Sequence, residues 1–351
     1  PFDVATQIFL GTLRRTPTRR ERSVTFVRLA TDPTATKKII SEIVTSSEFA
    51  RTSLPSLLAR EAQGFSSTRK IFFVHIPKTS GTSLREQLIS EMGIPGLELY
   101  GLEQDAKLVY PPFMDFWPLI AGHMNVYSGP RKTHTVVTTV REPQSRLLSL
   151  FREQTRLNYR VTPTTKGQNN SISLVARRLR HRGKERHFSD WLRNELPIYQ
   201  LSFFADPLSS LLRREMSVDA IRELPRRKLL RYISSSIRSL NEPELARTCD
   251  SATTEVDLVT WSDTAGVTQL LSNLFPERQV ASPKRLNDGT ELGSVREVQL
   301  TVDDLARLRE ISRVDKAFIA ALQRKGKLRP PALSEEEDFA KTAQRLGFIM
   351  P

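Results

Sequence analysis

The chain has 351 residues, of which 38% are hydrophobic and 26% are charged, a composition typical of a soluble globular protein rather than a disordered one. Its 53 lysines and arginines outnumber its 39 aspartates and glutamates, which gives a formal net charge of +14 and favours anionic partners. The single cysteine, Cys249, excludes an internal disulfide framework and any zinc site built from several cysteines. No apolar run is long enough to span a bilayer, so no transmembrane segment is expected.

The first 62 residues predict a small helical module of unknown role. Apolar residues recur at helical spacing in three stretches, and in the second of these Val24 and Val27 belong to the expected apolar side. Short patterns at residues 10–17 and 46–50 resemble a small helical module that is found appended to bacterial proteins. A polar stretch, residues 63–68, then predicts a linker.

From residue 69 onward, short apolar runs alternate with helical patterns. Four runs have the β-branched and aromatic residues of buried strands, and these are Ile71–Ile76, Leu119–Ala121, His134–Val140 and Val256–Trp261. Helical patterns follow at Leu84–Met92, at Ser145–Glu153 and before Leu274. This alternation predicts an α/β fold, with a largely parallel central sheet flanked by helices on both faces. Residues 171–250 read as mostly helical, residues 301–325 as a closing pair of helices, and residues 331–351 as a C-terminal tail.

The segment between the first strand and its helix, Pro77–Ser83, has the composition of an anion-binding loop. Small residues let backbone N–H groups converge, and the start of the following helix adds a partial positive charge. Lys78 places a cation at the rim. The order of residues is not that of a Walker A loop, and no G-x-G-x-x-G is present. The alternative is an ordinary strand-to-helix turn with an exposed lysine.

A second segment, after the third strand, could bind another phosphate. Arg141 leaves the strand end, and Ser149 follows eight residues later in the next helix. A guanidinium and a hydroxyl at this spacing can hold one phosphate between them, since arginine gives paired hydrogen bonds. The alternative is an Arg141 that pairs with Glu142, beside a serine on the helix surface.

Together these segments resemble the sulfotransferases that use 3′-phosphoadenosine-5′-phosphosulfate (PAPS), and are similar to carbohydrate sulfotransferases of bacterial type, like the heparan sulfate 2-O- and 6-O-sulfotransferases. Residues 74–83 look like the 5′-phosphosulfate loop of that family, and residues 139–149 look like its 3′-phosphate motif. Residues 121–123 resemble a glycine-histidine strand end, and residues 283–287 a late loop that closes over the nucleotide. The resemblance implies a P-loop-like central parallel sheet and a sulfotransferase domain over residues 69–330.

The resemblance also implies which residues bind the donor, PAPS. Lys78 and His123 would be catalytic, with His123 as the general base. One departure is Ser80, where many relatives have a second glycine, although a serine is small enough for the loop. The residues expected to hold the donor are Pro77, Lys78, Thr79, Ser80, Gly81, Thr82, Ser83, Arg141, Ser149 and Arg285.

The five histidines of the chain are candidates for a general base or for metal ligands. None lies at a metal-ligand spacing such as H-E-x-x-H, so no catalytic metal is expected. His123 stands at a predicted strand end, where α/β folds collect their sites, with a structural histidine as the alternative. His75 is more readily explained as structural, and His181 and His187 as acceptor contacts or surface residues.

We expect the reaction to transfer a sulfuryl group from PAPS to a hydroxyl of a saccharide or polysaccharide. The basic tract 156–186 suits such an acceptor, including an anionic one. Two alternatives are a phosphate-transferring nucleotide kinase on a related fold and a non-enzymatic polyanion-binding protein. Nucleic acid is disfavoured as a partner, because Tyr159 is the one aromatic residue between Arg152 and Arg186. The lack of cysteine pairs favours a bacterial cytoplasmic protein, or one of the Golgi lumen if a membrane anchor precedes Pro1.

Overall fold

The computed structural model describes most of the α/β region and parts of the N-terminal module. The predicted donor ligand Arg285, His181 and His187 lie outside the described residues, as does most of the basic tract 156–186. The described residues are 5, 8–9, 13, 17–32, 35–44, 46, 70–92, 97–98, 118–159, 188–194, 197–213, 216–278 and 297–351.

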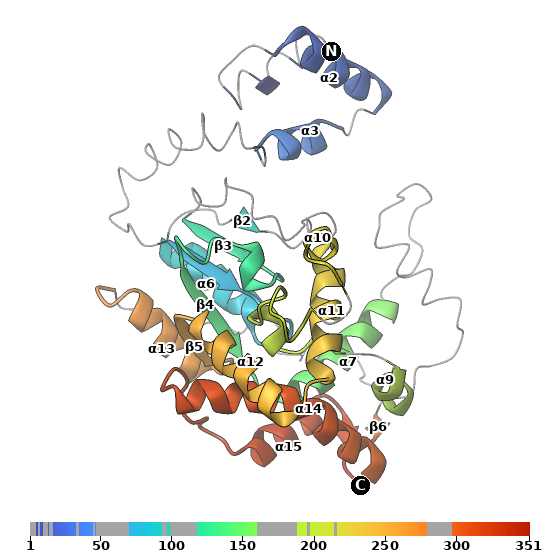
Figure 1. The fold of residues 1–351 in the computed structure, drawn as a ribbon, viewed down its shortest axis with the longest axis vertical. Helices are drawn as coiled ribbons and strands as arrows, with labels where there is room; N and C mark the ends of the chain where they lie inside the picture. Colours follow the sequence, from blue (N-terminus) through green and yellow to red (C-terminus); the bar gives the residue numbers. More distant parts are fainter. Residues whose placement is uncertain are drawn as a thin grey trace.

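Five parallel strands form the central sheet, in the order β2-β3-β1-β4-β5 (Figure 1). The strands are β1 (Ile71–Val74), β2 (Leu97–Glu98), β3 (Leu119–Gly122), β4 (Thr135–Val140) and β5 (Leu258–Trp261). All four residues of β1 and of β3 are buried, as expected for parallel strands covered on both faces. The predicted α/β fold with a central parallel sheet is therefore confirmed.

Helices cover both faces of the sheet because neighbouring side chains of a strand point to opposite faces. Phe73 lies in one core with α6 (Gly81–Met92) and α13 (Thr264–Leu274). Phe72 lies in a larger core on the other face, with α7 (Pro143–Tyr159), α11 (Arg226–Arg238) and α12 (Glu242–Thr254). The shorter elements on this side are η2 (Val126–Ser128), α9 (Phe188–Asn194), η3 (Leu201–Phe203) and α10 (Val218–Arg222).

Residues 301–325 form one helix, α14 (Val302–Arg324), where a pair of helices was expected. Thr301 and Asp304 cap its start reciprocally, and no glycine or proline interrupts its 23 residues. The helix ends before Gly326, whose φ of 67° suits a glycine. Its inner side packs along α12 and buries Asp315.

Residues 331–351, expected as a C-terminal tail, are instead part of the α/β domain. They form α15 (Glu335–Arg345) and β7 (Phe348–Ile349), and β7 pairs in parallel with β6 (Val298–Gln299). Phe339 and Phe348 are buried in the larger core. The acidic residues 335–338 form the first turn of α15, where carboxylates are stabilised by the helix dipole, so this polar stretch begins a helix.

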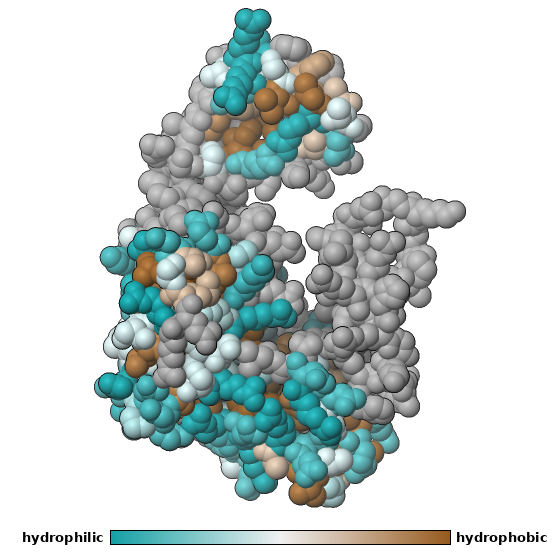
Figure 2. Space-filling model, turned by 45° about the vertical axis from the view of Figure 1, so that its right-hand side comes forward, coloured by the Kyte–Doolittle hydropathy of each residue, from teal (hydrophilic) through white to brown (hydrophobic). Residues whose placement is uncertain are grey.

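The N-terminal module contains α2 (Arg19–Thr31) and α3 (Ala35–Val44), drawn in Figure 1 at the opposite end of the molecule from α14 and α15. The helices are joined by an ion pair between Arg28 and Glu42, at 2.6 Å. The module has its own small core, made of Ile8, Phe9, Leu13, Ala35, Ile39 and Ile43. Val24 and Val27, expected on the apolar side, are more than half exposed, and Figure 2 shows apolar surface on this module. None of the helices in the described ranges combines the length and hydropathy needed to cross a bilayer.

Candidate functional site

The direction of the strand connections reverses between β1 and β4. The connection after β1 leads toward β2 on one side, whereas the connection after β4 leads toward β5 on the other. In parallel α/β sheets, ligands bind at such a reversal, outside the carboxyl ends of the two strands. Both predicted phosphate-binding segments follow these strands, so the fold brings them to one edge of the sheet.

The loop between β1 and α6 has an unusual backbone. Lys78 has a φ of 70° and Ser80 a φ of 57°, in the left-handed region that residues with a side chain seldom adopt. Loops of this kind turn successive N–H groups toward one side and bind anions there. The positive φ of Ser80 also explains why a glycine would suit this position, since a side chain costs about 1–2 kcal/mol there.

Three threonine hydroxyls hold together the loop, the end of β1 and β4. Thr139 Oγ1 donates to the carbonyl oxygen of Thr79 at 2.7 Å, and Thr138 Oγ1 donates to that of Val74 at 2.8 Å. Thr79 Oγ1 donates to the carbonyl oxygen of Ile76 at 2.8 Å and is fully buried. The Thr79 hydroxyl was expected among the anion donors, but here it stabilises the loop from within.

Gly81, the first residue of α6, leaves room for the ring of His75. A Cβ atom at position 81 would lie 1.9 Å from Cδ2 and 2.0 Å from Nε2 of His75. The ring cannot readily move, because it stacks on Phe73 at 5.4 Å between centroids and is 6% exposed. The contact between His75 and Gly81 therefore fixes the position of the start of α6 relative to β1.

Arg141 lies at the centre of the site. Its Nη1 donates to Ser149 Oγ at 2.9 Å and to the carbonyl oxygen of Lys78 at 3.5 Å. Its Nη2 donates to Thr342 Oγ1, on α15, at 2.9 Å. The side chain of Glu142, the alternative partner considered for Arg141, accepts hydrogen bonds from N–H groups at the start of α7. The structure thus joins Arg141, Ser149 and the Lys78 loop, as their order and spacing suggested.

The backbone of Arg141 is held by a buried polar network. The side chain of Gln200 makes two hydrogen bonds with it. Gln200 Oε1 accepts from the Arg141 backbone N–H at 3.1 Å, and Gln200 Nε2 donates to the Arg141 carbonyl oxygen at 3.0 Å. Asp315, on α14, accepts from the Gln200 N–H at 2.6 Å and pairs with Arg146 at 3.1 Å. Both charged side chains of this pair are nearly inaccessible to solvent.

A carboxylate faces the lysine of the loop. Glu153 Oε2 lies 3.5 Å from Lys78 Nζ, and both side chains are about one-third exposed. Glu153 follows Ser149 by one helical turn on α7, so the two residues share a face of the helix. Lys78 is therefore close to both a negative group and the guanidinium network.

The two candidate histidines lie side by side at the ends of β1 and β3. The ring centroids of His75 and His123 are 4.5 Å apart. The backbone N–H of His75 donates to the carbonyl oxygen of Gly122. Burial, followed by the nearby His123, Arg85 and Lys78, lowers the pKa of His75 well below its usual value. His75 is thus a neutral, buried ring. His123 is partly exposed beside the loop.

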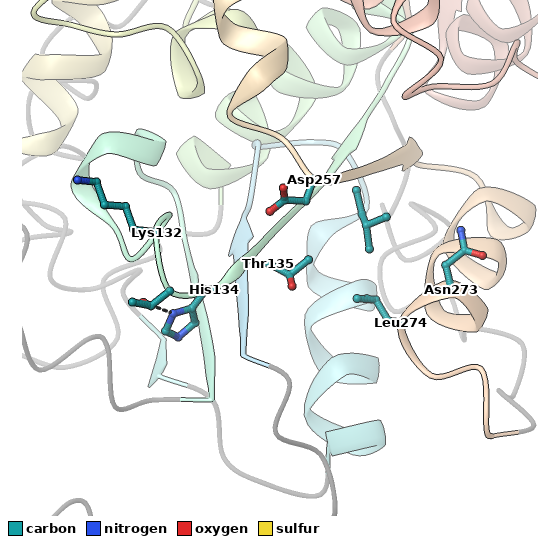
Figure 3. Close-up of a pocket in the computed structure, with 8 residues that line it drawn as sticks. Lys132, His134, Thr135, Asp257, Asn273 and Leu274 are labelled. Atoms are coloured by element: carbon teal, nitrogen blue, oxygen red, sulfur yellow. Dashed lines mark hydrogen bonds between the residues drawn. The ribbon is translucent and has the colours of Figure 1, made fainter.

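A cavity with a volume of about 580 Å³ lies at the opposite edge of the sheet. Figure 3 shows Thr135, the first residue of β4, and Asp257, just before β5, with Asn273 and Leu274 of α13 beside them. Asp257 accepts a hydrogen bond from the Val136 N–H at 2.7 Å and so serves the fold. This cavity includes none of the predicted site residues. The described residues also contain no group of three or more histidine, cysteine or acidic side chains that could hold a metal ion.

Comparison with known proteins adds no relative. No protein-family model matches the chain, and no curated protein sequence matches it.

Proposed function

We propose that this chain is a PAPS-dependent sulfotransferase that acts on a hydroxyl of a saccharide or polysaccharide. The observation that carries the proposal is the contact of Arg141 with both Ser149 and the Lys78 loop, after the neighbouring strands β1 and β4. A donor with two separate phosphate groups needs two neighbouring anion sites. A 5′-nucleotide without a 3′-phosphate would leave the second site unused.

The two sites divide the donor between them. The loop from Pro77 to Ser83, with its left-handed residues and the start of α6, would hold the 5′-phosphosulfate in a P-loop-like manner. Arg141 and Ser149 would hold the 3′-phosphate, since a guanidinium recognises phosphate by paired hydrogen bonds. The resemblance to the sulfotransferase motifs supports the same assignment.

The transfer needs a base and a stabilised leaving group. The acceptor oxygen would form a bond to sulfur while the bond between sulfur and the bridging phosphate oxygen breaks, and adenosine 3′,5′-bisphosphate would leave. His123 would take the proton of the acceptor hydroxyl, and Lys78 would stabilise the charge on the departing oxygen. The position of His123 next to β1 supports this role, because it lies beside the loop that would hold the sulfuryl group.

Titration calorimetry tests the proposal with adenosine 3′,5′-bisphosphate and adenosine 5′-phosphate. The wild-type protein should prefer the bisphosphate, and Arg141→Ala should weaken bisphosphate binding by about 2–5 kcal/mol, the scale for losing a buried charged partner. Binding of adenosine 5′-phosphate should hardly change. Equal affinity of the wild type for both nucleotides would favour a kinase, and binding of neither would favour a polyanion-binding protein.

The acceptor is then found by activity. Incubation with isotopically labelled PAPS and a panel of neutral and anionic glycans, followed by mass spectrometry, should detect a sulfated product. A protein that binds the bisphosphate but modifies no glycan in the panel would refute the saccharide assignment while leaving the donor assignment in place.

A further inference from the structure

The C-terminal helix α15 brings the side chain of Thr342 to Arg141. The helix is held against α7 by apolar contacts and by Arg152, which donates to the Gly347 carbonyl at 3.0 Å and lies over the ring of Phe348 at 4.5 Å. Ala343 and Leu346 belong to the same core. These contacts fix α15 without any need for the hydroxyl of Thr342.

That hydroxyl nevertheless lies on the guanidinium of Arg141. Thr342 is 4% exposed, and its Oγ1 accepts from Arg141 Nη2 at 2.9 Å. Ser149 Oγ accepts from Nη1 of the same group, also at 2.9 Å. Arg141 is thus held between two hydroxyls, which come from two helices that are far apart in the sequence. Packing alone would favour an apolar side chain at position 342, because burying a hydroxyl costs about 1–3 kcal/mol unless it is hydrogen-bonded.

The direction of these hydrogen bonds suits an anion. Arginine has donors and no acceptor, so each hydroxyl uses a lone pair on Arg141 and keeps its own proton. Elsewhere, threonines inside helices give that proton to the carbonyl four residues back, as Thr248 does to Glu244 at 2.8 Å. Within the described part of the chain, the bond from Arg141 is the one hydrogen bond of either hydroxyl. The two hydroxyls and the guanidinium of Arg141 can therefore all donate hydrogen bonds to one anion.

We propose that Thr342 is a further ligand of the phosphate group that Arg141 and Ser149 bind, and that it fixes the orientation of Arg141. The inference rests on the proposed function and extends the donor site to a helix outside the expected sulfotransferase domain. Since the site that Thr342 completes is the one for the 3′-phosphate, Thr342 would distinguish nucleotides that carry this group from those that lack it.

The test compares Thr342→Val and Thr342→Ser with the wild type. Calorimetry with adenosine 3′,5′-bisphosphate should give a loss of about 10- to 100-fold for Thr342→Val, the range for a hydrogen bond to a charged group. Adenosine 5′-phosphate should bind as before, and Thr342→Ser should restore bisphosphate affinity to within a few-fold. The matched control is Thr248→Val, a buried helical threonine whose loss should change neither affinity.

The outcomes separate this inference from the function it rests on. Unchanged bisphosphate affinity in Thr342→Val, equal losses for both nucleotides, or no rescue by serine would overturn the role of Thr342 alone. A wild type without preference for the bisphosphate would overturn the proposed function and this role with it. Thermal unfolding checks each variant, and Thr342→Ala replaces the valine variant if that one does not fold.

Discussion

The contact between Gly81 and His75 gives a sharp prediction for the loop. Replacing Gly81 with alanine places a Cβ 1.9 Å from His75 Cδ2, whereas carbon atoms in contact are normally about 3.5–4.0 Å apart. The ring is enclosed by Phe73 and His123, so the start of α6 must shift. Overpacking of this kind costs about 1–3 kcal/mol, and the higher helix propensity of alanine offsets up to about 1 kcal/mol. We expect a net loss of about 1–2 kcal/mol and weaker bisphosphate binding.

A double-mutant cycle isolates the cause. Urea unfolding of Gly81→Ala, His75→Ala and the double variant should give a coupling of about 2 kcal/mol, because removing the ring removes the clash. Gly326→Ala is the control: its φ of 67° strains any side chain, but no atom lies within 4 Å of the new Cβ. That variant should lose stability without losing nucleotide affinity. Additive effects of the Gly81 and His75 changes would refute the steric argument.

Two further predictions follow from charges near the loop. Glu153→Gln should raise bisphosphate affinity about 5-fold, because the Glu153 carboxylate and a bound phosphate carry like charges. Two such charges about 4 Å apart repel each other by about 1 kcal/mol even in water. Calorimetry checks this, with Glu255→Gln as a remote control, and a loss of affinity would contradict it. Stability should fall as the pH drops below about 6.5, since His75 must be neutral when folded but takes up a proton when unfolded. The slope should approach about 1.4 kcal/mol per pH unit in urea unfolding, and His75→Asn should reduce it; an identical slope in that variant would exclude His75 as the cause.

The sheet and one part of the site could be predicted from local patterns. The four apolar runs became strands because continuous burial on both faces requires such runs, which are visible in any short window. The pairing of Arg141 with Ser149 follows from their positions around the start of one helix, where eight residues bring a long side chain alongside a hydroxyl. The role of His123 as general base and the role of Lys78 in binding the donor nucleotide stay predictions.

Other parts of the site could not be predicted, because their partners are remote in the sequence. Gln200 and Asp315 are ordinary polar residues whose importance arises only when the fold brings them to Arg141 and Arg146. No periodicity or motif marks such long-range pairs. Glu153 did carry a signal, since it stands one helical turn after Ser149.

The C-terminal segment also carries a local signal for a helix. Ser334 and Glu337 form a capping box, a pattern that marks the start of a helix. Phe339, Ala343 and Leu346 then recur at helical spacing and become its buried side. The acidic first turn gave this segment the composition of a tail, although its later residues are those of an amphipathic helix.

The hydrogen bond between Arg141 and Thr342 spans 201 residues, which ties the donor site to the order of protein synthesis. At about 5–20 residues per second, α7 leaves the ribosome roughly 10–40 s before α15. During that interval Phe151 of α7 lacks its contact with Phe348, and Arg141 lacks one of its two hydroxyl partners. A nascent chain stalled before residue 335 should therefore bind chaperones through α7, and it should acquire nucleotide affinity only after α15 has been made.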